Sequence, residues 1–235
     1  MKALFYLISG AFLSWTLAAQ SAPTKTEDFQ KMQVLGVLSR APKADFEAKM
    51  PPLFKEQFAA CAKCELRNLT PYDAEGNVDW KQVPGALEAA SSQVPVLFLS
   101  WNDVASEKNK ELVAALKAWT AKGLFLIGPA GEPEGEGPSH ALSRTMLGQV
   151  PDAMIIGELN ERESFPKRSF YGPEMLTALK APPDLRGDNF AAVMFASRLL
   201  REWNRRPSTE WVSHFRARKS LSKRIWPGLD EFFNR

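Results

Sequence analysis

The chain has 235 residues, of which 45% are hydrophobic and 24% are charged, so its composition is that of a globular protein. Its 30 Lys and Arg residues against 27 Asp and Glu give a net charge of +3, which is too small to indicate a nucleic-acid partner. Only 2 Cys and 2 His are present, in a spacing that builds neither a disulfide-rich scaffold nor a metal site, so we expect no metal ion and no cofactor.

Residues 1–21 have the layout of a secretory signal peptide. A short basic start at Lys2 is followed by an apolar run from Ala3 to Ala19, which ends in small residues suited to cleavage. The run is short for a membrane span, which needs ~20 apolar residues, although a single membrane anchor is the alternative. We therefore expect an exported protein, periplasmic or secreted, with a flexible polar leader over residues 22–32.

Residues 33–206 are predicted to form one α/β domain, since such domains commonly reach about 200–250 residues. The first half of this domain alternates short apolar segments with segments rich in helix formers. In chain order, we predict a strand at Gln33–Leu38, a helix over Ala44–Lys63 with a break at Pro51 and Pro52, a strand at Glu65–Thr70 and a helix within Val78–Ser92.

The clearest pattern is a strand, a helix and a second strand joined by short links. Val94–Leu99 is almost continuously apolar, as expected of a strand that is buried on both faces. Ser106–Lys122 is amphipathic, and Gly123 follows it in the usual place for a helix end. Leu124–Ile127 is apolar again. This unit predicts two parallel neighbouring strands joined by a right-handed crossover.

The segment from Gly128 to Pro138 is rich in Gly and Pro, and it follows the carboxyl end of a predicted parallel strand, where α/β proteins place their sites. Further strands are predicted at Ala153–Gly157 and Met175–Lys180. A helix is predicted over Asp188–Arg201. Its first part, Phe190–Ala196, is apolar on all sides, so we expect it to run through the core.

Several segments carry motifs in a definite order. Val94–Trp101 ends in a Leu-Ser-aromatic step, Leu124–Glu132 ends in Ala-Gly-Glu, and Gly187–Val193 has the spacing of a Gly-Thr-Ser-x-Ala-x-Pro motif. With Pro151–Gly157 and the stretch 162–182, these segments resemble those of the subtilisin-like serine proteases. The resemblance implies a three-layer α/β fold, with a mostly parallel central sheet flanked by helices.

The positions that match the family's catalytic motifs carry other residues. Asn189 stands in place of the nucleophilic Ser, and an amide has no hydroxyl with which to attack a carbonyl. Glu132 stands in place of the oxyanion-hole Asn, and a carboxylate cannot donate a hydrogen bond to an oxyanion. Ser39 and Arg40 follow the first strand where an Asp is expected, and no His precedes His140. The resemblance therefore implies a catalytically inactive member, with Glu132 and Asn189 close together across its cleft.

The family's cleft binds an extended peptide as an added strand, which requires main-chain groups rather than a triad. The resemblance thus implies a peptide or protein ligand, contacted by Ser100, Trp101, Asn102, Gly128, Ala130, Gly131, Glu132 and Asn189. One alternative is a weak or non-standard hydrolase, with residual serine peptidase chemistry or a relocated site at Glu132, Asp188 or His140. Another is an envelope-associated structural protein.

Cys61 and Cys64 have the spacing of a thiol–disulfide redox motif, but they end a helical segment instead of opening one. A structural disulfide is the preferred interpretation in an oxidising compartment, and a redox pair, free thiols and metal ligands are alternatives.

The segment after Leu124–Ile127 contains a histidine and three glutamates, and each has a functional and a non-functional interpretation. His140 is interpreted as an ordinary loop histidine, with a catalytic role as the alternative. Glu132, Glu134 and Glu136 form a solvated acidic loop or, together with Asp188, a pocket for a cation or a basic peptide.

Residues 207–235 are predicted to be a basic, aromatic, helical extension. From Arg201 to Arg235 the chain carries an excess of Lys and Arg, with Trp203, Trp211, Phe215, Trp226, Phe232 and Phe233 interleaved. We expect its aromatic side chains to pack on the domain. Contact with a partner protein, or with a membrane surface of anionic lipid, is the alternative.

Overall fold

The computed structural model describes residues 33–59, 61–133, 140–160, 162, 169–180, 188–203, 210, 211, 213–215, 217 and 233. The predicted signal peptide, the predicted leader and most of the extension at 207–235 lie outside these residues. None of the helices formed by the described residues combines the length and the hydrophobicity that a membrane span requires.

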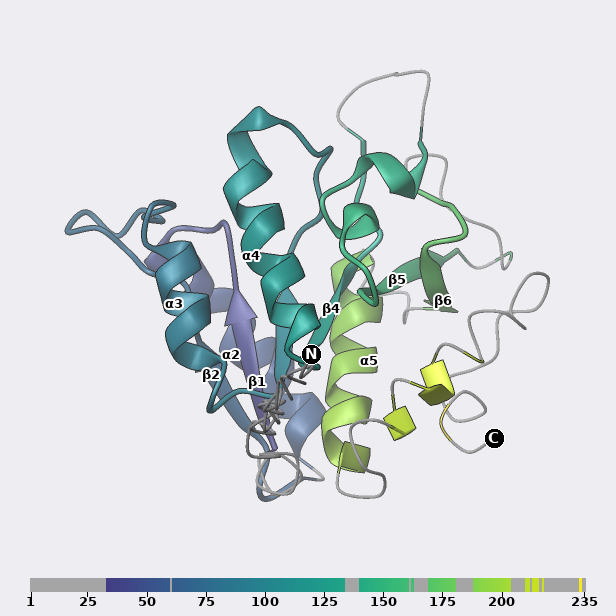
Figure 1. Cartoon of the computed structure of the whole chain (residues 1–235). Helices are drawn as coiled ribbons and strands as arrows, with labels where there is room; N and C mark the ends of the chain where they lie inside the picture. The colour runs from purple at the N-terminus through teal and green to yellow at the C-terminus, as the bar shows by residue number, and fades with distance from the viewer. Residues whose placement is uncertain are drawn as a thin grey trace, which may run out of the picture.

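A sheet of six strands forms the centre of the domain (Figure 1). The strands are β1 (Val34–Leu38), β2 (Glu65–Asn68), β3 (Val96–Leu99), β4 (Phe125–Pro129), β5 (Met154–Leu159) and β6 (Met175–Lys180). Their order across the sheet is β2-β1-β3-β4-β5-β6, and every neighbouring pair is parallel. The parallel pairing of β3 with β4 confirms the prediction made from the strand–helix–strand pattern.

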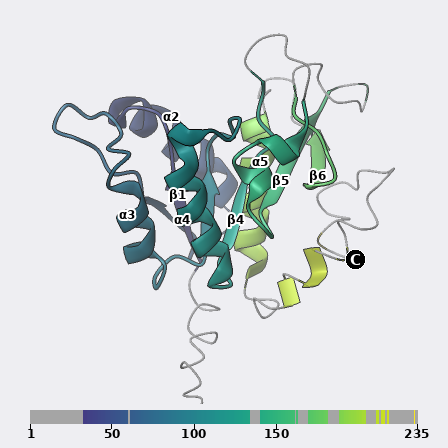
Figure 2. The same cartoon turned by 45° about the horizontal axis from the view of Figure 1, so that its top comes forward.

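Helices cover both faces of the sheet, which gives the predicted three layers (Figures 1 and 2). Helices α3 (Val83–Ala90) and α4 (Lys110–Ala121) lie on one face, and α2 (Lys43–Phe58) and α5 (Asp188–Glu202) lie on the other. Short turns of 3-10 helix lie in the described connections, namely η1 (Glu107–Asn109), η2 (Leu142–Arg144) and η3 (Leu147–Gln149).

The central strands are buried on both faces, as their apolar sequences predict. In β3, Val96 and Phe98 face the α2–α5 layer, whereas Leu97 and Leu99 face the α3–α4 layer. The Phe190–Ala196 part of α5 lies in the core, with all but the half-buried Met194 buried. The other predicted elements are present, with their ends displaced by a few residues.

Helix α2 runs through Pro51 and Pro52 without ending, so the predicted break is wrong. Proline cannot donate a main-chain hydrogen bond, but the two carbonyls that lose a donor belong to Glu47 and Ala48, which are exposed to water. Phe46 and Phe54, on either side of the prolines in sequence, are buried in the same core cluster. Burial of both rings against the sheet keeps the helix continuous.

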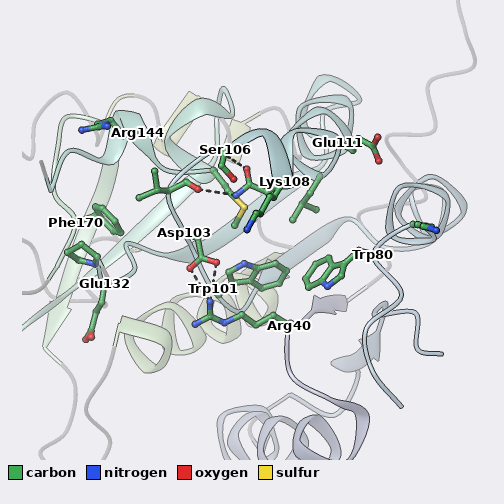
Figure 3. Close-up of a pocket in the computed structure, with 16 residues that line it drawn as sticks. Arg40, Trp80, Trp101, Asp103, Ser106, Lys108, Glu111, Glu132, Arg144 and Phe170 are labelled. Atoms are coloured by element: carbon green, nitrogen blue, oxygen red, sulfur yellow. Dashed lines mark hydrogen bonds and ion pairs between the residues drawn. The ribbon is translucent and has the colours of Figure 1, made fainter. Parts of the chain in front are cut away.

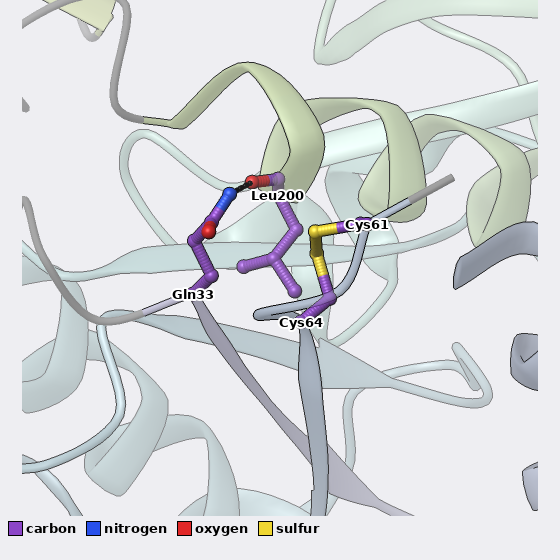
Figure 4. The surroundings of a disulfide bond; sticks show 4 residues. All are labelled: Gln33, Cys61, Cys64 and Leu200. Carbon is purple, nitrogen blue, oxygen red and sulfur yellow. Dashed lines mark hydrogen bonds between the residues drawn. A yellow bond between two sulfur atoms is a disulfide. The ribbon is translucent and has the colours of Figure 1, made fainter. Parts of the chain in front are cut away.

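Cys61 and Cys64 form a disulfide, with their Cα atoms 5.4 Å apart, which confirms the predicted pairing (Figure 4). The disulfide closes the turn between α2 and β2, at the amino edge of the sheet. Beside it, the Gln33 side-chain amide donates a 3.0 Å hydrogen bond to the Leu200 carbonyl oxygen. This edge is opposite the carboxyl ends of the strands, where the sequence places the site.

The described aromatic residues of the C-terminal region pack on the α5 side of the sheet. Trp203, Trp211, Phe215 and Phe233 are each exposed by 4% or less. The Trp211 indole N–H donates a 3.3 Å hydrogen bond to the Trp203 carbonyl oxygen, and the Trp211 and Phe215 rings stack with their centroids 5.4 Å apart. Trp226 and Phe232 lie outside the described residues.

Asn102 joins three segments at the carboxyl edge of the sheet, and its side chain is almost wholly buried. Its Nδ2 group donates to the Ala130 carbonyl oxygen at 2.9 Å and to Thr145 Oγ1 at 3.0 Å, and its Oδ1 accepts from the Leu147 N–H at 3.0 Å. These bonds hold the turns after β3 and β4 against the connection that contains η2 and η3. Gly131, with a φ of +83°, lies so close to the Asn102 carbonyl oxygen that a Cβ would overlap it.

Replacing Asn102 with Ala is expected to lower the free energy of unfolding by about 2–4 kcal/mol, because the Ala130 carbonyl and the Leu147 N–H would be left unpaired in the interior. Urea-induced unfolding followed by tryptophan fluorescence measures this loss. The matched control is Asn77→Ala, since Asn77 is exposed and its replacement should change stability by no more than about 0.5 kcal/mol. If Asn102→Ala were as mild as this control, the Asn102 side chain would not hold this edge together.

Candidate functional site

A cavity of about 760 Å³ opens at the carboxyl edge of the sheet, beside the ends of β1, β3 and β4 (Figure 3). Its size is that of a site for a small ligand or for a few residues of a peptide. The lining is mixed, with the aromatic residues Trp80, Trp101 and Phe170, the basic residues Arg40, Lys81, Lys108 and Arg144, the acidic residues Asp103, Glu111 and Glu132, and Val104, Ser106, Asn109, Leu112, Pro133 and Met146.

The lining residues come from segments that are far apart in the sequence. Arg40 follows β1, Trp101 follows β3, and Glu132 follows β4. Because the strands are parallel, the turns at their carboxyl ends meet at one edge of the sheet. Lys108 in η1 and Arg144 in η2 complete the lining from the connections after β3 and β4.

Two tryptophans form the main apolar surface of the cavity. Trp101 is only 6% exposed, whereas Trp80, which precedes α3, is 47% exposed. Their rings meet edge to face, with the centroids 5.6 Å apart. The cavity therefore offers an apolar side chain a rigid aromatic surface that is partly open to solvent.

Arg40 and Asp103 form an ion pair within the cavity, drawn with dashed lines in Figure 3. The Arg40 Nη1 atom lies 3.1 Å from each Asp103 carboxylate oxygen. The two side chains are 55% and 41% exposed, so solvent screens their attraction. The other charged side chains of the lining, Lys81, Lys108, Arg144, Glu111 and Glu132, make no hydrogen bond or ion pair with the described residues.

The main chain that follows β3 has polar groups without partners. Among the described residues, nothing hydrogen-bonds to the Ser100 carbonyl, or to the main-chain N–H and C=O groups of Trp101 and Asn102. Trp101 and Asn102 are buried, and buried main-chain groups nearly always have partners. Of these three residues, Trp101 lines the cavity.

The next residues along the chain are already paired. Val104 and Thr145 form an antiparallel bridge. The Ala105 N–H donates to the Arg144 carbonyl oxygen at 2.8 Å, and the Met146 N–H donates to the Asp103 carbonyl oxygen at 2.9 Å. The unpaired edge is therefore limited to the segment from Ser100 to Asn102.

The residues predicted to contact a ligand have different surroundings. Trp101 and Glu132 line the cavity, and Ser100 precedes Trp101. Asn102, Gly128 and Ala130 are buried, and Gly131 packs against Asn102, so these four shape the wall from behind. Contact of any of these residues with a ligand stays a prediction.

Asn189 and His140 are not among the residues that line the cavity. Asn189 is exposed in the first turn of α5, and its predicted closeness to Glu132 stays a prediction. His140 faces Tyr171, with the ring centroids 6.3 Å apart, and its carbonyl oxygen accepts from the Tyr171 N–H at 2.8 Å.

Glu134, Glu136 and the Asp188 side chain lie outside the described part of the chain. Within the described part, no group of three or more His, Cys, Asp and Glu residues is placed to hold a metal ion.

Several lining residues were missed at the level of sequence, namely Trp80, Lys81, Lys108, Arg144 and Phe170. They belong to connections without a recognisable motif. Only their position in the fold could have indicated that they line the cavity. Trp80 and Lys81 lie shortly before α3, and Phe170 lies shortly before β6.

Comparison with protein-family models and with curated proteins found no match. Comparison with solved structures found similar chains. A cold-adapted subtilisin-like serine proteinase has a TM-score of 0.55 at 13% identity, covering 78% of this chain and 81% of that one. A lanthipeptide protease has a TM-score of 0.54 at 14% identity, covering 81% of each chain. MycP1 without its N-terminal propeptide has a TM-score of 0.52 at 12% identity, covering 81% of this chain and 86% of that one.

These likenesses extend over most of this chain and over most of each compared structure. They agree with the resemblance carried by the motifs at Val94–Trp101 and Leu124–Glu132, and with the all-parallel sheet between two helical layers. The chain therefore has a subtilisin-like fold.

Proposed function

We propose that this chain is an exported pseudoprotease that binds an extended peptide, or an extended segment of a protein, without cleaving it. The observation that carries the proposal is the unpaired main chain from Ser100 to Asn102, of which Trp101 lines the cavity. A peptide added there as a strand would pair with alternate residues of this segment and satisfy buried polar groups. Its alternate side chains would point into the cavity.

The lining supports a peptide as the ligand. The edge-to-face pair of Trp80 and Trp101 suits an apolar or aromatic side chain, since large aromatic anchors carry much of the energy at protein interfaces. The unpaired charges around this pair, such as Lys108 and Glu132, are placed to contact polar side chains of the same peptide.

The residues of the cavity argue against peptide cleavage. No His is among the described residues that line it, and Ser106 carries their only hydroxyl, so these residues do not supply the Ser–His pair of a serine peptidase. Arg40 follows β1, where the resemblance implies an Asp. Glu132 brings a carboxylate to the turn after β4, where a hydrogen-bond donor is required.

Peptide binding is tested with a pool of fluorescein-labelled pentapeptides that have Val at positions one, three and five and random residues between them. Fluorescence anisotropy should rise on binding, and N-methylation of the peptide main chain should abolish the rise, because it removes the donors that a strand needs. Trp80→Ala should weaken binding about tenfold, as expected for loss of an aromatic anchor. Tyr171→Ala is the control, because Tyr171 is also exposed but lies outside the cavity.

Two other outcomes would favour the alternative functions. Fluorophosphonate labelling of a serine in the unmodified protein, with digestion of casein, would indicate a weak or relocated hydrolase and overturn the inactive assignment. Flotation with liposomes of anionic lipid, lost when residues 201–235 are removed, would indicate an envelope role. Equal binding of N-methylated and ordinary peptides would exclude recognition by strand addition.

Restoring the family's residues is expected not to restore cleavage. Asn189→Ser with Glu132→Asn returns a hydroxyl and an oxyanion donor, but no His or Asp occupies the matching upstream positions. A site without its triad retains at most about 10³–10⁴-fold acceleration over water, which ordinary peptidase assays do not detect. Hydrolysis of a fluorogenic peptide measures the result, and peptide binding should persist. Robust turnover would reveal a hidden base, with His140→Ala as the next variant to examine.

A further inference from the structure

The Arg40–Asp103 ion pair spans the end of the sheet next to the unpaired main chain. β1 and β3 are neighbours, with Leu38 in register with Leu99, and Arg40 and Asp103 follow them by two and four residues respectively. The Ser100 N–H donates to the Leu38 carbonyl oxygen at 3.0 Å, which is the last main-chain hydrogen bond between the segments that continue β1 and β3. Beyond it, among the described residues, the side chains of Arg40 and Asp103 make the next link between them.

The two partners differ in how firmly they are held. The Asp103 main chain is fixed, because its carbonyl oxygen accepts from the Met146 N–H. The guanidinium of Arg40 has no hydrogen-bond partner among the described residues besides Asp103. Its backbone neighbours are held, since the Ser39 N–H donates to Thr70 Oγ1 and the Ala41 N–H donates to Ser39 Oγ. Arg40 is therefore a long side chain on a fixed base, with a single partner that it can exchange.

We propose that this ion pair closes the unpaired edge in the free protein, and that a carboxylate of the peptide ligand opens it by replacing Asp103 on Arg40. This inference rests on the proposed function, and it assigns the ligand to the class of peptides that carry an acidic side chain. Arg40 then acts as a specificity-determining residue, and Asp103 acts as an internal competitor for it.

The chemistry of the pair supports exchange. Arg40 contacts both Asp103 oxygens through Nη1 alone, so a ligand carboxylate can make the same two bonds, or the stronger planar fork that uses two nitrogens of the guanidinium. The pair is half exposed, and ion pairs with this exposure contribute little to stability, so its replacement is favourable once the peptide main chain adds its own hydrogen bonds. Lys81, Lys108 and Arg144 line the cavity without a described partner, as do Glu111 and Glu132. With Arg40 and Asp103 included, the lining has four basic and three acidic side chains, a small excess that favours an acidic ligand over a basic one.

The test uses two members of the peptide pool, Val-Glu-Val-Glu-Val and its neutral counterpart Val-Gln-Val-Gln-Val, with the whole chain and three variants. The unmodified protein should bind the acidic peptide more tightly. Asp103→Asn removes the competing carboxylate with little change in shape, and it should tighten binding of the acidic peptide by about three- to fivefold, the factor equivalent to one exposed ion pair. Arg40→Gln should reduce the ratio of the two affinities to about one.

Glu65→Gln is the matched control. It removes a carboxylate from the Arg67–Glu65 ion pair, which has similar exposure. Glu65 is the first residue of β2, and neither partner lines the cavity. This variant should leave both affinities unchanged. Thermal unfolding of all four proteins checks that each is folded, and both Arg40 and Asp103 are exposed enough to be replaced without loss of the core.

The outcomes separate this inference from the function on which it rests. Three results would overturn the role of the ion pair and leave peptide binding standing. They are equal affinity of the unmodified protein for both peptides, weaker binding of the acidic peptide by Asp103→Asn, and a preference for the acidic peptide that survives Arg40→Gln. If neither peptide binds to any of the four proteins, the proposed function is overturned, and the inference with it.

Discussion

The buried amide of Asn102 is the interaction on which the carboxyl edge of this protein depends. One side chain supplies donors to the Ala130 carbonyl and to Thr145, and an acceptor to the Leu147 N–H. The turns after β3 and β4 would otherwise be free to separate, because the ladder between these strands stops before Asn102. With the amide in place, the unpaired main chain next to it is held beside the cavity. The site is thus preorganised by a residue whose own side chain faces the interior.

Under the proposed function, the cavity keeps a binding edge of the fold without the chemistry of peptide cleavage. Strand addition uses main-chain groups, which any sequence supplies, whereas acyl transfer requires a base, a nucleophile and oxyanion donors at fixed positions. Here Arg40 and Glu132 bring charges to the turns where an Asp and a donor are implied by the resemblance. These charges do not remove the main-chain edge, and they give the cavity an electrostatic pattern of its own.

Much of the architecture could be predicted from the sequence, because long apolar runs such as Val94–Leu99 leave few alternatives to a buried strand. The site was harder to predict. Asn102 was expected to contact a ligand, yet its side chain points inward, because the direction of a side chain after a strand depends on a turn that periodicity does not describe. Trp80 and Arg144 come from connections where no motif marks them, so only the three-dimensional meeting of strand ends identifies them. The two prolines of α2 show the opposite case, since burial of Phe46 and Phe54 overrode a local preference to break the helix.

We propose that a peptide pairs with the main chain between Ser100 and Asn102. The most direct measurement is amide hydrogen exchange at Trp101 and Asn102, by NMR, in the free protein and at saturating Val-Gln-Val-Gln-Val peptide. An added strand pairs with alternate residues, so exchange should slow strongly at one of these two amides, while the already paired Ala105 amide changes little. Unchanged exchange at both Trp101 and Asn102 while the peptide is bound would contradict the account.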